Sequence, residues 1–466
     1  MSVNGSGAYD LVVLGSGTGG YACALRAVEF GMKVALIEKD PTLGGTCLNR
    51  GCIPTKALLH AAEIADHTRD AGAVGVKATF EGIDMAGVNA YKDKIVSTSI
   101  KGLTGLIKAK GITIIEGRGR VTGPTTIQVT GNDGQVTDVE GAHIVLATGS
   151  VPRSLPGLDI DGDKVISSDH ALKLERVPSS AVVLGGGVIG VEFASVWKSF
   201  GADVTIVEAL PHLLPLEEES SSKRLERAFR KRGIKYELGA RFESVKPSDA
   251  GVTVTLEGGK TIDAEVLLVA VGRGPVSQDI GYEQIGVEIE RGFVKVDEYC
   301  RTSVPTISAI GDLIPTLQLA HASFAEGILV AERLGGLNPP PIDYTGVPRI
   351  TYSSPEVASV GLTSPQAAER GYETIEYTYD LAGNGKSKIL QTQGEVKVIA
   401  QKDGPVLGIH IVGERVGELI AEGQLIYNWE ALPSEVAQLI HPHPTQSEAI
   451  GEAFLALAGK PLHVHG

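Results

Sequence analysis

The chain has 466 residues, including 59 glycines and 4 cysteines, and its formal net charge is −14. A hydrophobic content of 42% excludes global disorder, and glycines without a three-residue period exclude a collagen-like chain. The negative charge argues against nucleic-acid binding, and so few cysteines exclude a secreted disulfide scaffold. The length predicts about three domains.

The two ends of the chain show no targeting signal, and no apolar run approaches the ~18 residues of a transmembrane helix. The longest apolar runs have the length of strands, for example residues 266–271. We therefore expect a cytoplasmic protein that binds neither a membrane nor nucleic acid, in a compartment that keeps thiols reduced.

The first predicted elements form a strand–helix–strand unit. An apolar run at 11–14 leads into the glycine-rich residues 15–20, a helical stretch ends near Gly31, and a second apolar run at 34–37 ends at Glu38. This order is typical of a βαβ unit that binds a dinucleotide.

A second copy of this unit follows in the middle of the chain. The apolar run 182–184 meets the glycines of 185–190, the helix ends near Gly201, and the strand 204–207 ends at Glu208. In both copies the acid follows the first glycine by 23 residues, from 15 to 38 and from 185 to 208. The repeat predicts two dinucleotide-binding sites.

The glycine spacing has a physical reason. In each copy the first glycine permits a tight turn, the second lets the backbone approach a pyrophosphate, and the third lets the helix pack on the strand. The helix start supplies free N–H groups and a partial positive charge, and the acid binds ribose hydroxyls. These positions are Gly15, Gly17, Gly20 and Glu38 in the first copy and Gly185, Gly187, Gly190 and Glu208 in the second.

The acid of the second copy also bears on the choice of nucleotide. A carboxylate at Glu208 would repel a 2′-phosphate, and no arginine occurs at 209–211. NAD is therefore favoured over NADP at this copy.

Three further predicted strands end in a glycine: residues 143–148 at Gly149, 266–271 at Gly272 and 306–310 at Gly311. The carboxyl ends of parallel strands face the ligand in dinucleotide-binding folds. We therefore expect Asp312, which directly follows the last of these glycines, to bind a cofactor hydroxyl.

Cys47 and Cys52 precede an amphipathic stretch at 57–64, so the second cysteine lies near a helix start, where the dipole lowers a thiol pKa. A zinc site lacks enough nearby ligands, and a structural disulfide is disfavoured in a reducing compartment. Two unrelated core cysteines are the remaining alternative, and Cys23 and Cys300 are interpreted in that way. For the pair, a redox-active disulfide is the favoured interpretation.

Two segments carry a resemblance to a known family. Residues 44–56, which read GGTCLNRGCIPTK, resemble the active-site signature of the class I pyridine nucleotide–disulfide oxidoreductases. Residues 441–448 resemble the family's His-x-His-Pro…Ser-Glu motif, and the resemblance runs along essentially the whole chain. Within the family, the sequence is most similar to members that oxidise protein-bound dihydrolipoamide with NAD⁺.

The resemblance implies an α/β fold with two Rossmann-like dinucleotide-binding domains, for FAD and NAD, and an α+β C-terminal dimerisation domain. The expected segments are an FAD domain with the redox disulfide at 1–150, an NAD domain at 151–275, a return to the FAD domain at 276–345, and an interface domain at 346–466. In the family, the interface domain forms a homodimer and brings the His–Glu pair of one subunit to the disulfide of the other.

The resemblance also implies the site residues. The expected catalytic residues are Cys47, Cys52, His443 and Glu448, with Lys56 and Glu192 as a flavin-side ion pair. The expected FAD contacts are Gly15, Gly17, Gly20, Glu38, Thr46, Lys56, Gly119, Thr148, Gly149, Ser150, Asp312, Ala320 and His321. The expected NAD contacts are Gly185, Gly187, Gly190, Glu192, Glu208, Phe242 through its backbone, and Gly272. No metal site is expected, His441 is expected to be structural, and His463 and His465 are expected in a frayed terminus.

The implied partner is the lipoyl domain of a 2-oxoacid dehydrogenase or glycine-cleavage complex. A glutathione- or trypanothione-type reductase would need cationic residues near Glu208, and a mercuric reductase would need a C-terminal cysteine pair that this chain lacks. A scaffold without activity is disfavoured because every catalytic residue is present. The chain departs from the family at 274–276, which reads Gly-Pro-Val where the family usually has Pro-Asn, and this leaves a loop contact to the cofactor open.

Overall fold

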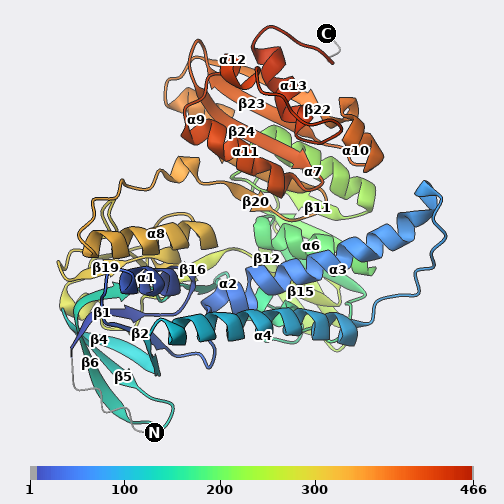
Figure 1. Ribbon diagram of the computed structural model, residues 1–466. Helices are drawn as coiled ribbons and strands as arrows, with labels where there is room; N and C mark the ends of the chain where they lie inside the picture. The colour runs from blue at the N-terminus through green and yellow to red at the C-terminus, as the bar shows by residue number, and fades with distance from the viewer. Residues whose placement is uncertain (1–7, 464–466) are drawn as a thin grey trace. The chain divides into compact units, whose positions relative to one another are not determined.

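The computed structural model describes residues 8–463 and divides into two compact units, which are described separately (Figure 1). The first unit comprises Met1–Ala57, Ala86–Arg153 and Arg273–Tyr344; the second comprises Leu58–Met85, Ser154–Gly272 and Thr345–Gly466. These breaks fall close to the predicted ones at 150, 275 and 345. Residues 58–85, however, group with the second unit, and so do both the NAD and the interface segments; the four-segment division stays a prediction.

The first unit is built on a seven-stranded sheet with a parallel half and an antiparallel half. Its path is β3-β2-β1-β6-β5-β4, and β19 pairs with β6 beside it. The bounds are β1 Tyr9–Leu14, β2 Val34–Glu38, β3 Thr113–Glu116, β4 Arg118–Gly123, β5 Thr126–Thr130, β6 Val136–Leu146 and β19 Ile307–Ala309. The later residues of β6 pair in parallel with β1 and β19, and its earlier residues pair antiparallel with β5. All five residues of β2 are buried, as expected for a strand covered on both faces.

Helices α1 (Thr18–Val28) and α8 (Ala320–Leu334) lie side by side in this unit (Figure 1). Their contact depends on Gly327, because a Cβ there would collide with the Gly19 carbonyl oxygen and lie 2.9 Å from the Cys23 nitrogen. The other elements of the unit are α2 Gly45–Arg50, β7 Ser150–Pro152, β16 Arg273–Pro275, the hairpin β17 Ile289–Glu290 and β18 Phe293–Val294, and the 3₁₀ turns η2 Glu283–Ile285 and η3 Gly311–Leu313. Two longer helices, α3 Cys52–Asp70 and α4 Met85–Ala109, run across the breaks between the units.

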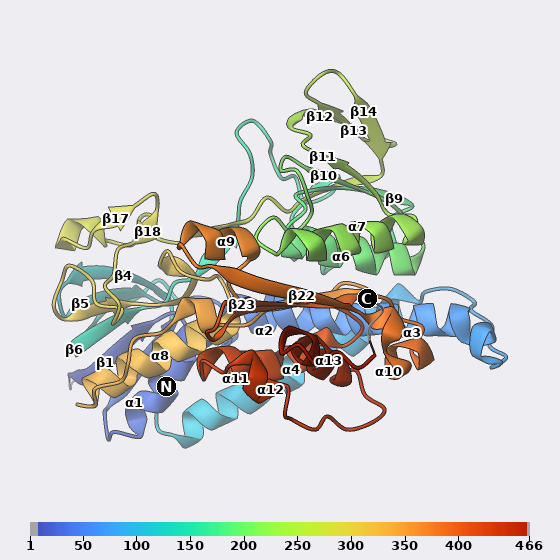
Figure 2. The ribbon, with the colours of Figure 1, turned by 90° about the horizontal axis from the view of Figure 1, so that it is seen from above.

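The second unit contains a five-stranded parallel sheet in the order β11-β10-β9-β15-β8. Figure 2 shows α6 and α7 beside its strands β9, β10 and β11. The bounds are β8 Val165–Ile166, α5 Ser168–Ala171, β9 Ser180–Leu184, α6 Val188–Phe200, β10 Asp203–Glu208, α7 Glu219–Arg232, β11 Lys235–Leu238 and β15 Val266–Val269. A three-stranded antiparallel sheet is formed by β12 Phe242–Ser248, β13 Gly251–Leu256 and β14 Thr261–Ala264. The predicted strand at 266–271 therefore ends two residues early, and the other strands and helices of both glycine units are confirmed.

The C-terminal part of the second unit is a five-stranded antiparallel sheet in the order β20-β21-β24-β23-β22. The bounds are β20 Arg349–Thr351, β21 Glu356–Gly361, α9 Ser364–Glu369, β22 Thr374–Asp380, α10 Gly385–Ile389, β23 Glu395–Gln401, β24 Val406–Gly413, α11 Val416–Asn428, α12 Pro433–Val436 and α13 Glu448–Leu457. Figure 2 shows α11, α12 and α13 together on one side of β22 and β23. The apolar core on that face includes Val360, Ile409 and Phe454. The predicted α/β fold class is confirmed.

The opposite face of the same sheet carries a polar row. Arg349, Ser359, His410 and Lys397 are successive cross-strand neighbours on β20, β21, β24 and β23. Lys397 Nζ lies 2.8 Å from a carboxylate oxygen of Glu218, the residue that precedes α7. The row therefore connects the antiparallel sheet to the second glycine unit through buried charge.

His410 is fully buried in this row, and its Nε2 lies 2.9 Å from the Leu362 carbonyl oxygen. Because a carbonyl only accepts, Nε2 carries the proton and Nδ1 is the basic nitrogen. Burial lowers the pKa of His410, and the nearby charges act in both directions: Glu217 and Glu218 raise it, while Arg349 lowers it.

No helix among residues 8–463 is both long enough and apolar enough to cross a membrane.

The Gly327→Ala variant should lose about 1–3 kcal/mol of unfolding free energy, because α1 and α8 must separate to admit the methyl group. The matched control is Gly102→Ala in the interior of α4, where a Cβ would meet no atom within 4 Å. That change should leave stability equal or raise it by up to about 1 kcal/mol through helix propensity. Urea denaturation of both variants measures this, and equal stability of the two would show that the helix contact is not close.

Acidification should destabilise the second unit through His410. Since the folded-state pKa is depressed, the unfolded state binds the proton more readily, so stability is complete above the ordinary value of 6.5 and falls as the pH drops below it. The loss should be about 1 kcal/mol over the first pH unit. His410→Gln keeps a donor for the Leu362 carbonyl and cannot titrate. The difference in unfolding free energy between wild type and variant should therefore change with pH between 7.5 and 5.5; a constant difference would contradict the assignment.

Candidate active site

The first glycine loop holds the end of β1 against the end of β6. Gly15 has a φ of +107°, and a Cβ there would collide with the Ala147 carbonyl oxygen. A Cβ on Gly20 would collide with the Gly15 carbonyl oxygen, whereas the space beside Gly17, the residue before α1, is open. The amides of the first helical turn have no intrahelical acceptor, so this open side fits a pyrophosphate.

The second loop repeats this arrangement within the second unit. Gly185 has a φ of +111° and abuts the Ala270 carbonyl oxygen, and a Cβ on Gly190 would collide with the Gly185 carbonyl oxygen. Gly187 precedes α6 and has open space beside it. The residues present therefore fit a second dinucleotide at the start of α6.

The two acids are oriented by equivalent backbone donors. One oxygen of Glu38 accepts from the Ser16 N–H at 2.9 Å, and the other accepts from the Asp40 N–H at 2.9 Å. Glu208 likewise accepts from the Gly186 N–H at 2.6 Å and the Leu210 N–H at 2.8 Å. An ionised carboxylate has about four acceptor sites, so each acid retains capacity for ribose hydroxyls.

The segment that departs from the family lies partly in the short strand β16, which pairs with β7 just after the end of β6. The antiparallel pair of β7 and β16 places Gly274 opposite Val151. The Val276 N–H donates to the Gly149 carbonyl at 2.8 Å, and Thr148 Oγ1 donates to the Val276 carbonyl at 2.6 Å. The departure thus has a structural role beside two expected FAD contacts.

The remaining expected cofactor contacts lie at several places in the two units. Ser150 Oγ and Asp312 Oδ2 are 2.5 Å apart, at the start of β7 and in η3. Ala320 and His321 begin α8. Gly119 lies on β4, where a Cβ would meet a Leu14 side-chain carbon at 2.5 Å.

Phe242 begins β12 and packs against the apolar core of the second unit. Gly272 has a φ of +104° and follows β15 by three residues. Both therefore belong to the second unit together with the second glycine loop.

The cysteine loop lies directly on the first glycine loop. Gly45 has a φ of +58°, and a Cβ there would be 2.6 Å from the Gly17 Cα. The Gly44 N–H donates to the Ser16 carbonyl at 3.1 Å. Cys47 lies in α2 and Cys52 begins α3, so the predicted helix at 57–64 starts five residues earlier.

Both cysteines are free thiols in this structure, and their side chains are hydrogen-bonded to each other. The contact with Cys52 and burial raise the pKa of the Cys47 thiol, while the positive charge of Lys56 opposes the shift. Tyr21 on α1 interacts electrostatically with both cysteines. Burial, Cys47 and Cys52 together raise the pKa of Tyr21 to about 12. The sequence reasoning did not identify Tyr21, which carries no local signal in a glycine-rich helix.

Lys56 and Glu192 lie in different units. Glu192 on α6 is 3% exposed, and one of its oxygens accepts from the Tyr352 N–H at 2.9 Å. The expected pairing of these two side chains stays a prediction.

His443 and Glu448 are brought together as predicted. His443 Nδ1 lies 2.8 Å from one Glu448 oxygen, and the Thr445 N–H donates to the other at 2.8 Å. Slight burial opposes ionisation of Glu448, but these two hydrogen bonds hold its pKa below the ordinary value. A carboxylate on Nδ1 leaves Nε2 as the basic nitrogen, and the His443 side chain is 80% exposed.

Two neighbouring histidines form similar pairs. His441 Nε2 lies 2.7 Å from Glu422, and this hydrogen bond raises the pKa of His441. His463 was expected in a frayed terminus, but its backbone N–H and its Nδ1 both contact Glu452. That expectation is wrong for His463, because a carboxylate one turn after Glu448 on α13 accepts both groups; His465 lies outside the described residues.

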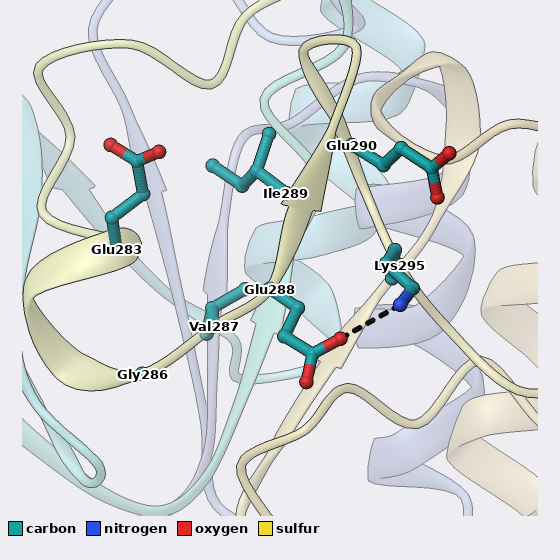
Figure 3. Close-up of a pocket in the computed structure, with 7 residues that line it drawn as sticks. All are labelled: Glu283, Gly286, Val287, Glu288, Ile289, Glu290 and Lys295. Carbon is teal, nitrogen blue, oxygen red and sulfur yellow. Dashed lines mark hydrogen bonds and ion pairs between the residues drawn. The ribbon is translucent and has the colours of Figure 1, made fainter.

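Two other features do not form part of this site. In the described part of the chain, Glu63, His67 and Glu414 have the spacing of metal ligands, but Arg415 lies 4.0 Å from Glu63 and 3.7 Å from Glu414 and already supplies positive charge there. A shallow hollow lies at η2 and the β17–β18 hairpin (Figure 3). It presents three glutamates and Lys295, whose Nζ is 2.8 Å from Glu288, so it is not suited to an anionic pyrophosphate.

Comparison with known proteins agrees with this geometry. A family model described as pyridine nucleotide-disulphide oxidoreductase matches residues 9–327, and the dimerisation-domain model of the same family matches residues 347–454.

Characterised relatives match along nearly the whole chain. The chain is 41% identical to dihydrolipoyl dehydrogenase of Bacillus subtilis over 98% of this chain and 99% of that protein. It is 40% identical to mitochondrial dihydrolipoyl dehydrogenase of Pisum sativum over 99% of this chain and 94% of that protein. The crystal structure of LpdA from Mycobacterium tuberculosis matches with a TM-score of 0.89 at 27% identity, over 96% of this chain and 99% of that one. The chain therefore belongs to the pyridine nucleotide-disulphide oxidoreductases.

Proposed function

We propose that the chain is a dihydrolipoyl dehydrogenase, which oxidises a protein-bound dihydrolipoyl group at the Cys47–Cys52 pair and reduces NAD⁺ to NADH. The observation that carries the proposal is the position of this pair, hydrogen-bonded to each other in a loop that lies on the first glycine loop. Relatives with this name at about the same identity over nearly the full chain support it.

The first glycine loop fits FAD and the second fits NAD. The helix start beside Gly17 would hold the FAD pyrophosphate, and Glu38 and Asp312 would bind its hydroxyl groups. Glu208 would bind the ribose of NAD and disfavour a 2′-phosphate. Thiols cannot transfer a hydride, and nicotinamide accepts only a hydride. The flavin, when bound, supplies the link, because it can accept an electron pair from a thiolate and donate a hydride to nicotinamide.

The protein's own residues would perform the thiol chemistry. His443 Nε2 removes a proton from one substrate thiol, and Glu448 stabilises the resulting imidazolium through Nδ1–H. The substrate thiolate attacks Cys47 Sγ of the Cys47–Cys52 disulfide, and Cys52 leaves as a thiolate. After His443 has released its first proton to solvent, it accepts the proton of the second substrate thiol, which attacks the substrate sulfur of this mixed disulfide and displaces Cys47 as a thiolate. The cyclic substrate disulfide then leaves, and the cysteine pair holds the two electrons.

We further infer a homodimer in which His443 of one subunit serves the cysteine pair of the other. The dimerisation-domain match over residues 347–454 supports the dimer. The partner that presents the substrate would be a lipoyl domain of a 2-oxoacid dehydrogenase or glycine-cleavage complex. A reducing cytoplasm suits the chain, since Cys23 and Cys300 are free thiols in addition to the pair.

Purified holoprotein should be yellow and should reduce NAD⁺ with dihydrolipoamide, with much weaker activity on NADP⁺ because of Glu208. The measurement is NADH absorbance at saturating dithiol, with each nucleotide compared through kcat/KM. Turnover of NADPH with glutathione disulfide or a mercuric ion, together with no dihydrolipoamide activity, would assign the chain to a different reductase class.

Two inactive variants should complement each other in a mixed dimer. Cys52→Ser removes the disulfide, and His443→Gln should lower turnover by about 10²-fold or more. A heterodimer of the two has one site with both defects and one intact site, so it should show about half of the wild-type activity. Co-expression with two different affinity tags isolates this heterodimer.

The control variant is His60→Gln, which removes a different His–Glu contact. His60 lies 3.1 Å from Glu63 on the exposed side of α3. An inactive heterodimer would mean that His443 serves the cysteines of its own subunit. Full activity of the His443→Gln homodimer would remove this histidine from the reaction altogether.

A further inference from the structure

Arg273 occupies a position that the site described above does not use. It begins β16 and lies opposite Pro152 of β7 in the short two-stranded ribbon. Its side chain is 13% exposed, so its guanidinium has lost most of its contact with water. A buried guanidinium is stable only when protein acceptors surround it.

Those acceptors belong to three separate segments of the first unit. Arg273 Nε donates to Ser150 Oγ at 2.7 Å, and Nη2 donates to the Ser150 carbonyl at 2.7 Å. The same Nη2 lies 3.4 Å from Thr46 Oγ1, in the residue before Cys47. Ser150 Oγ in turn donates a hydrogen bond to Asp312 Oδ2, and Arg273 Nε is 3.9 Å from that oxygen.

We propose that Arg273 is a positioning residue that fixes the redox-cysteine helix and the flavin-binding carboxylate in one rigid frame. Through Ser150 it sets the direction of the Asp312 carboxylate, and through Thr46 it holds the start of α2 in place. The inference deepens the proposed function, because it assigns a role to a residue of the flavin–disulfide site that touches neither substrate nor the reacting sulfurs.

The side-chain chemistry favours arginine at this position. A planar guanidinium can direct parallel N–H bonds to the hydroxyl and the carbonyl of one residue while a third bond reaches a second segment. A lysine ammonium carries the same charge but is a single point on a flexible stem. The Ser150 hydroxyl accepts from Arg273 and donates to Asp312, so loss of the guanidinium would free this hydroxyl to rotate away from the carboxylate.

The test measures FAD binding by the apoprotein, followed by quenching of flavin fluorescence, without any dithiol or nucleotide. Arg273→Gln should weaken FAD binding by about tenfold or more, the cost of losing a hydrogen bond that involves a charged group. Arg273→Lys should fall between Gln and wild type. The matched control is Arg153→Gln, an exposed arginine at the end of the same ribbon, which should stay within about twofold of wild type.

A double-mutant cycle tests the route through Ser150. If Arg273 acts on Asp312 through this hydroxyl, Ser150→Ala should weaken FAD binding. The double variant Ser150→Ala/Arg273→Gln should then lose less FAD-binding free energy than the sum of the two single losses. Additive effects would remove Ser150 from the route. An FAD affinity of Arg273→Gln equal to that of wild type would overturn the proposal.

A second readout reports on the cysteine helix. In the reduced holoprotein, Arg273→Gln should raise the rate at which iodoacetamide alkylates Cys47, because α2 loses its contact through Thr46. Peptide mass spectrometry assigns the label, and Arg153→Gln again serves as the control. An unchanged alkylation rate would mean that Arg273 does not hold this helix. Both readouts are independent of the substrate, so a failed dihydrolipoamide assay would reject the proposed function and leave this result standing.

Discussion

Close approach of backbone to backbone at two glycine turns is the constraint on which the rest of the structure depends. Gly15 and Gly185 each have a positive φ and abut a carbonyl oxygen of the neighbouring strand end, at Ala147 and Ala270. No residue with a Cβ can occupy either of these two positions without moving the strands apart. Because the turns are this tight, each following helix begins at the carboxyl edge of its sheet, where its N–H groups face outward. The acid at the end of the next strand is then held by the amide directly after the first glycine of the turn.

The first of these turns also determines where the redox chemistry can occur. Since Gly17 and Gly45 are in near contact, the cysteine loop has only one position relative to the start of α1. A cofactor pyrophosphate at that helix start would lie within reach of the same loop. A loop also lies on the second turn, since the Leu214 N–H donates to the Gly186 carbonyl at 2.9 Å, but residues 209–217 carry no cysteine. The two copies thus share their backbone physics and differ in what the surrounding chain places on them.

The local parts of this architecture could be predicted from the sequence, and the contacts between distant segments could not. Glycine spacing and apolar periodicity located both loops, both acids and the cysteine pair, because each feature depends on residues close together in the chain. Arg273, Tyr21 and the Glu452 partner of His463 were missed, since their contacts join positions far apart, which no short pattern reveals. The sequence of segment 274–276 departs from the family pattern and left a cofactor contact open. In the structure, Val276 of this segment is hydrogen-bonded to Thr148 and Gly149, beside the β7–β16 ribbon.

Buried charge explains why the second glycine unit and the antiparallel sheet form one compact unit. The Lys397 ammonium faces Glu218 at 2.8 Å and Glu376 at 3.0 Å, and Arg224 of α7 contacts Glu395 at 2.7 Å. If the two parts separated, these charges would lose their partners. Each charge would then be either buried and unpaired in a low-dielectric interior or exposed to water. Charge pairs of this kind add little net stability but strongly disfavour any other alignment of the two parts. The antiparallel sheet, on which α13 with Glu448 packs, and the helix α6 that carries Glu192 are therefore held in one fixed alignment.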